Sequence, residues 1–173
     1  MKTSSRSEPH SDEMRAEYDF SGGVRGKYVD RKGPQHDNYG KSVLALATRG
    51  ACQRAGPSVS TNYGASSAHI DGTVGLTVAV EIESRTGKQV RGAILDLILH
   101  DNPKKLLILI PKYFGKHQPQ ECEFILKRFV GPQDFRVVLL EGTGDDPCLE
   151  TDALKVRAAL AELGWEVSGS GAG

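Results

Sequence analysis

The chain has 173 residues, and its 22 lysine and arginine residues balance 22 aspartate and glutamate residues, so the formal net charge is zero. This length suits one domain with a tail, and the neutral total argues against a polycation that coats nucleic acid or membrane. Three widely spaced cysteines without a CxxC pair support neither a disulfide framework nor a zinc knuckle, and we see no secretory signal or membrane-length apolar run, so we expect a cytoplasmic protein without a membrane partner.

Residues 1–37 predict a disordered or extended N-terminal arm, since their polar composition lacks a periodic apolar pattern. Within this arm, residues 15–33 mix aromatic, charged and glycine residues, and the stretch EYDFSGGVRGKY resembles the opening of some small bacterial antitoxin-type proteins. The resemblance implies a protein partner for residues 15–33, whereas the composition alone favours a tethered tail. A single folded domain is expected over residues 38–167, followed by a flexible tail at residues 168–173.

The folded part is expected to begin with a helix over residues 41–55, closed by Gly56-Pro57. Two short alternating runs at residues 67–74 and 77–84 then predict a β-hairpin. A pairing centred on Leu76 places Ile70 opposite Ile82 on an apolar face. The intervening residues 57–67 are a loop or contain one more strand.

The second half of the chain alternates helices and buried strands. Helices are expected over residues 88–101 and 119–130, and strands over residues 105–111 and 135–140. A last helix is expected over residues 152–163, with Thr151 as its N-cap. An antiparallel hairpin that leads into right-handed crossovers predicts an α/β fold with a mixed sheet flanked by helices.

Three carboxylates fall on one face of the predicted hairpin. Asp71 lies on one strand opposite Glu81 of the other, and Glu83 follows Glu81 by two residues, so all three side chains point to the same side. Such carboxylates repel one another unless they are protonated, solvated or bridged by a cation. Their oxygen atoms suit Mg²⁺ or Mn²⁺, which can activate water for phosphate hydrolysis. The other interpretation is a solvated polar face on an edge hairpin.

Cations follow directly after these carboxylates. Arg85, Lys88 and Arg91 are placed to hold a phosphate backbone. In residues 41–117 basic side chains exceed acidic ones by five, and in residues 118–173 the excess is reversed. The neutral total therefore hides a basic block that contains the carboxylates, and we expect the acidic C-terminal segment to face away from nucleic acid.

The segment AHIDGTVGLTVAVEIESRTGKQVRGAILDLILHDNPKKLLILIP resembles the core of the PD-(D/E)xK, restriction-endonuclease-like nuclease superfamily. That family's core is a helix, a three-stranded meander, a helix and a strand. Asp71 and Glu81 match its two acidic positions, and Glu83 stands where the family usually has lysine, as in an E-x-E variant. The resemblance covers about residues 41–140 and implies a β-meander followed by αβαβα.

By this resemblance, Asp71 and Glu81 bind Mg²⁺ or Mn²⁺, and Glu83 is a further ligand or orients the attacking water. Lys88 would replace the missing lysine. The implied function is metal-dependent hydrolysis of DNA, and the alternative is a non-catalytic module that binds nucleic acid or protein on the same fold. Restriction-type nucleases often act as dimers because two DNA strands require two sites, so a homodimer is one expected arrangement.

Overall fold

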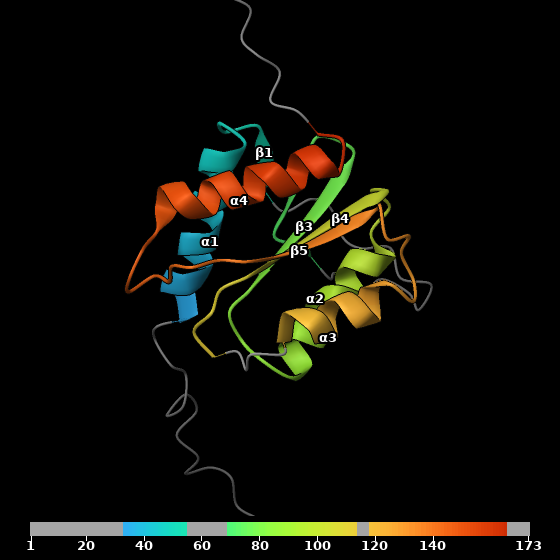
Figure 1. Ribbon diagram of the computed structural model, residues 1–173, viewed down its shortest axis with the longest axis horizontal. Helices are drawn as coiled ribbons and strands as arrows, with labels where there is room; N and C mark the ends of the chain where they lie inside the picture. Colours follow the sequence, from blue (N-terminus) through green and yellow to red (C-terminus); the bar gives the residue numbers. More distant parts are fainter. Residues whose placement is uncertain (1–32, 55–68, 114–117, 166–173) are drawn as a thin grey trace, which may run out of the picture. The chain divides into compact units, whose positions relative to one another are not determined.

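The computed structural model describes residues 33–54, 69–113 and 118–165 (Figure 1). The predicted partner segment, residues 15–33, lies outside this part except for Gly33, and so does the predicted C-terminal tail. In chain order the elements are α1 (Gly33–Ala47), β1 (Cys52–Arg54), β2 (Gly72–Val74), β3 (Val78–Glu83), α2 (Lys88–Leu99), β4 (Lys104–Leu109), α3 (Gln118–Leu126), β5 (Phe135–Leu139) and α4 (Leu149–Glu162). None of these helices has the length and apolar character that a bilayer crossing requires.

The five strands form one mixed sheet in the order β1-β2-β3-β4-β5. The first three strands pair antiparallel, and β3, β4 and β5 pair in parallel. The expected α/β class with a mixed sheet is therefore confirmed. After α1, the described chain is a three-stranded meander followed by α2, β4, α3, β5 and α4.

The β2–β3 hairpin has the predicted register over its paired residues, with Gly72 opposite Val80. Gly75 takes a positive φ of 57° in the connecting turn, which glycine adopts without strain. The predicted pairing of Ile70 with Ile82 is wrong. Strand β2 begins only at Gly72, so Ile70 leaves the ladder and packs among residues of α2 and α3, whereas Ile82 packs on the opposite face of the sheet.

Helix α1 differs most from its prediction over residues 41–55, since it runs from Gly33 to Ala47. Residues 33–37, assigned to the arm, therefore belong to the helix, where His36 is only 1% exposed. The helix ends before a turn in which Arg49 and Gly50 both have positive φ. The following residues pair with β2 as strand β1 at Cys52–Arg54. Residues 57–67, where the sequence left one more strand open, lie outside the described part of the chain.

Helix α4 begins at Leu149, ahead of the predicted start, and Thr151 is not its N-cap. In the first turn of α4, Asp152 instead makes hydrogen bonds to the segment after β5 and to α1. Its fully buried carboxylate accepts hydrogen bonds from the backbone N–H of Glu141 at 2.7 Å and of Gly142 at 2.9 Å. The Tyr39 hydroxyl donates to the same carboxylate at 2.6 Å, which joins α1 to α4.

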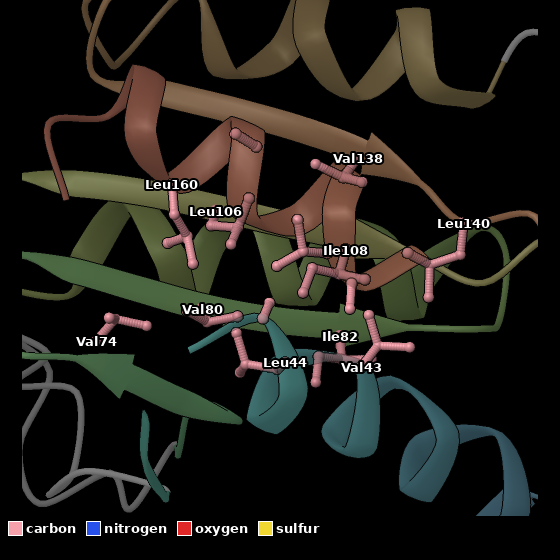
Figure 2. Packing of buried hydrophobic residues seen from close by; sticks show 14 of the residues in the cluster. Val43, Leu44, Val74, Val80, Ile82, Leu106, Ile108, Val138, Leu140 and Leu160 are labelled. Carbon is pink, nitrogen blue, oxygen red and sulfur yellow. The ribbon is translucent and has the colours of Figure 1, made fainter. Parts of the chain in front are cut away.

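Apolar clusters cover both faces of the sheet. On one face, α1 and α4 pack over side chains of β2 to β5, and Figure 2 shows Val43 and Leu44 of α1 beside Val80 and Ile82 of β3. On the other face, α2 and α3 pack over β3, β4 and β5. Every residue of β3 is buried, so the acidic side chains that alternate with its apolar ones are enclosed beneath α2.

Candidate functional site

The three predicted carboxylates meet in one hollow of about 290 Å³ at the carboxyl end of β3. Glu81 and Glu83 point to the same side because side chains alternate along a strand, and Asp71 joins them just ahead of β2. We call this space the carboxylate hollow. Its lining comprises Asp37, His69, Asp71, Glu81, Ile82, Glu83, Arg85, Gln89, Gly92, Ala93 and Asp96.

Asp71 and Glu81 form a hydrogen-bonded pair. The backbone N–H of Ile82 donates to Asp71 Oδ2 at 2.9 Å, which fixes the Asp71 carboxylate against β3. Burial raises the pKa of Glu81 to about 10, and the charge and hydrogen bond of Asp71 add to this effect. At neutral pH and without a cation, Glu81 is therefore the protonated member of the pair and donates to Asp71. A bound divalent cation would favour the charged form of both groups.

Glu83 is engaged with Arg85. Its Oε1 accepts hydrogen bonds from the backbone N–H of Ser84 at 2.9 Å, the backbone N–H of Arg85 at 2.8 Å and Arg85 Nε at 2.9 Å. Its Oε2 accepts a further bond from Arg85 Nη2 at 3.2 Å. This pairing raises the pKa of the Arg85 guanidinium and holds it at the rim of the hollow. To act as a metal ligand, Glu83 would have to give up part of this contact.

Lys41 is a residue of the site that the sequence did not single out. Its Nζ lies 3.4 Å from Asp71 Oδ1, so α1 supplies a cation to the carboxylates. Asp37, one helical turn earlier, lines the carboxylate hollow. Asp37 and Lys41 are four residues apart and therefore share one face of a helix. The sequence did not predict this, because the expected helix began only at residue 41 and left Asp37 outside it.

Asp96 is the other acidic residue that prediction missed. It lies on α2, two turns after Gln89, on the helix face that covers the hollow. Burial raises the pKa of both Asp37 and Asp96. For Asp37, the nearby Arg85 and Lys41 charges oppose this effect. The hollow therefore holds more carboxylates than its neighbouring cations neutralise, which favours the uptake of protons or of a cation.

Of the three predicted phosphate contacts, only Arg85 reaches the carboxylate hollow. Lys88 and Arg91 are exposed on α2, and the described lining contains neither of them. Gly87, with φ of 69°, turns the chain just before α2, and the neighbouring Gln89 is the side chain that enters the lining. Among the described residues, the lysine that forms an ion pair with one of these carboxylates is Lys41 of α1.

The donor set fits a hard divalent cation in part. Mg²⁺ is commonly held by one or two carboxylates and completes its shell with water and phosphate oxygens. Asp71 and Glu81 provide such a pair in direct contact. Among the described residues, however, no group of three or more histidine, cysteine, aspartate or glutamate side chains is arranged to hold a metal ion. The engagement of Glu83 with Arg85 is a physical reason for this.

Comparison with known proteins adds no assignment to this geometry. No family model matches the chain, and neither a curated protein nor a solved structure matches it.

Proposed function

We propose that the chain is a metal-dependent nuclease that hydrolyses DNA phosphodiester bonds on a restriction-endonuclease-like fold. The observation that carries the proposal is the meeting of Asp71, Glu81 and Glu83 in one hollow with cations at its edge. The meander followed by alternating helices and strands also agrees with the order that the resemblance implies.

In this proposal Asp71 and Glu81 hold Mg²⁺ or Mn²⁺. When bound, the ion would lower the pKa of a water molecule and stabilise charge on the phosphate. The Glu81 carboxyl group must lose its proton to become a ligand, and the buried position next to Asp71 makes that loss costly without the ion.

The remaining residues of the site hold the substrate. Arg85, fixed by two contacts to Glu83, presents its guanidinium at the rim, where it can donate to a phosphate oxygen. Lys41 can place a second positive charge beside Asp71. Gln89 and His69 add hydrogen-bonding groups to the lining. Exposed Lys88 and Arg91 extend the positive charge along α2 and contact the phosphate backbone outside the hollow.

The first experiment is a cleavage assay on plasmid and linear DNA with Mg²⁺, Mn²⁺ or EDTA. Wild type should cleave with either ion and not in EDTA. Asp71→Asn and Glu81→Gln keep the shape of the side chains but remove the negative charge, and each should lower cleavage by about 100-fold or more. Asp146→Asn, an equivalent change at an exposed position, is the matched control. Undiminished cleavage in EDTA would refute the proposal.

Non-catalytic nucleic-acid binding on the same fold is the second candidate. It is favoured by the Glu83–Arg85 pairing and by the lack of a three-donor metal group among the described residues. This function predicts that DNA is bound with and without divalent ions and that no ion supports cleavage. An Arg85→Met variant should then weaken DNA binding, whereas Asp71→Asn should not.

A further inference from the structure

A second hollow, of about 540 Å³, adjoins the carboxylate hollow. The two share Asp71, which lines both. Helix α1 forms one wall of the second hollow with Asn38, Lys41 and Ser42, the turn after α1 contributes Gly50, and strand β1 contributes Cys52. The Lys41–Asp71 ion pair, with Nζ and Oδ1 3.4 Å apart, lies where the two spaces meet.

We propose that the second hollow binds the nucleoside next to the phosphate that the carboxylate hollow holds, and this inference rests on the proposed nuclease function. Small-molecule sites commonly measure about 300–1,000 Å³. The second hollow falls in this range, whereas the carboxylate hollow is smaller and is lined by acidic groups that suit a cation, through which a phosphate can be held. A nucleoside joined to that phosphate therefore has room on the Lys41 side of Asp71.

The chemistry of the second hollow matches the parts of a nucleotide. Lys41 can contact the phosphate that links the two spaces. The side-chain amide of Asn38 is exposed and has no hydrogen bond within the described residues, so it can donate to and accept from a base edge. Ala45 and Cys52 provide apolar surface for the sugar or the base face.

Ala45 and its neighbour on α1 allow a matched test. Ala45 is exposed and lines the second hollow, so Ala45→Trp should fill the space without entering the core. Leu46 is 42% exposed and lies outside the lining, so Leu46→Trp adds the same ring to the same helix beside the hollow. Circular dichroism melts establish that both variants fold like wild type.

Binding of thymidine 5′-monophosphate and of inorganic phosphate is measured by calorimetry for all three proteins. Wild type and Leu46→Trp should bind the nucleotide at least about tenfold more tightly than phosphate, and Ala45→Trp should lose that preference. Equal affinity of wild type for both ligands, or an undiminished preference in Ala45→Trp, would overturn the inference.

Hydrolysis separates this inference from the nuclease proposal. With Mn²⁺, Ala45→Trp should show a KM for an oligonucleotide about tenfold above that of wild type, whereas Leu46→Trp should match wild type. If wild type does not cleave the oligonucleotide, the nuclease proposal fails and the calorimetry still decides the nucleoside site. If Ala45→Trp cleaves the oligonucleotide like wild type, the nucleoside site fails and the nuclease proposal stands.

Discussion

The Glu81 carboxyl group should control how the stability of the folded chain depends on pH. Its pKa of about 10 exceeds the ordinary value of 4.5, chiefly because the group is buried. The folded chain thus binds this proton more tightly than the unfolded chain does. The resulting stabilisation is fully present below the ordinary pKa and is lost as the pH rises towards 10.

In EDTA, wild type should therefore lose thermal stability between about pH 6 and pH 9, whereas Glu81→Gln, which cannot ionise, should change less. The measurement is the Tm of both proteins across this range. Comparing them at each pH separates Glu81 from the other titrating groups, including Asp37 and Asp96. Adding Mg²⁺ at pH 8 should raise the Tm of wild type more than that of the variant. Parallel Tm profiles in EDTA would contradict the assignment.

Substitution of Lys41 and of Lys88 should affect different kinetic constants. Lys41 contacts Asp71, so Lys41→Met should lower kcat about 10- to 100-fold by removing a charge beside the reacting phosphate. Lys88 is exposed and outside the lining, so Lys88→Met should raise KM and leave kcat within about twofold. Steady-state kinetics on a DNA oligonucleotide separate the two effects. A larger loss of kcat in Lys88→Met would return the catalytic role to the start of α2.

At the scale of elements, close packing of α1 on β3 brings Asp37 and Lys41 to the site. Gly40 lies between them, and a Cβ there would overlap the Ile82 side chain and lie 3.2 Å from Ile110 Cδ1. Alanine in a helix is favoured over glycine by about 1 kcal/mol, but overpacking a core costs about 1–3 kcal/mol. The packing term is the larger one at this position.

Gly40→Ala should therefore destabilise the chain by up to about 2 kcal/mol and displace α1 from β3. Gly92 of α2 is the matched control, because a Cβ there meets no atom within 4 Å and its φ is not positive. Gly92→Ala should raise stability by up to about 1 kcal/mol. Urea unfolding gives both values, and nuclease activity should fall in Gly40→Ala because α1 carries Asp37 and Lys41. If Gly40→Ala were more stable than wild type, the Ile82 side chain would have moved to make room for the added Cβ, and the prediction would be wrong.

The whole molecule shows which parts of the site are readable from sequence. The meeting of Glu81 and Glu83 follows from the two-residue period of a strand, which is local and does not depend on what packs above it. Asp37 reaches the carboxylate hollow, and Lys41 reaches Asp71, only because α1 docks on the sheet. The segment GPQHDNYGK is a weak helix former by composition, and its first turns are stabilised by tertiary contacts such as that of Tyr39 with Asp152.

The distribution of charge over the molecule leads to a prediction for DNA affinity. The net charge is zero, so attraction of DNA must come from the local cations around the carboxylate hollow. Lys88 and Arg91 lie on α2, on the sheet face that contains the hollow, whereas Lys155 lies on α4, which packs on the opposite face. Each phosphate contact contributes about −0.9 to the slope of log K against log salt concentration.

The double variant Lys88→Gln, Arg91→Gln should therefore bind DNA less tightly and show a slope that is shallower by about two. Lys155→Gln is the control and should leave both affinity and slope as in wild type. Fluorescence anisotropy with a labelled duplex, measured at several salt concentrations in Ca²⁺ to limit cleavage, gives the slopes. If the slope became shallower in Lys155→Gln but stayed as in wild type in the double variant, the DNA would bind the α4 face, away from the carboxylate hollow.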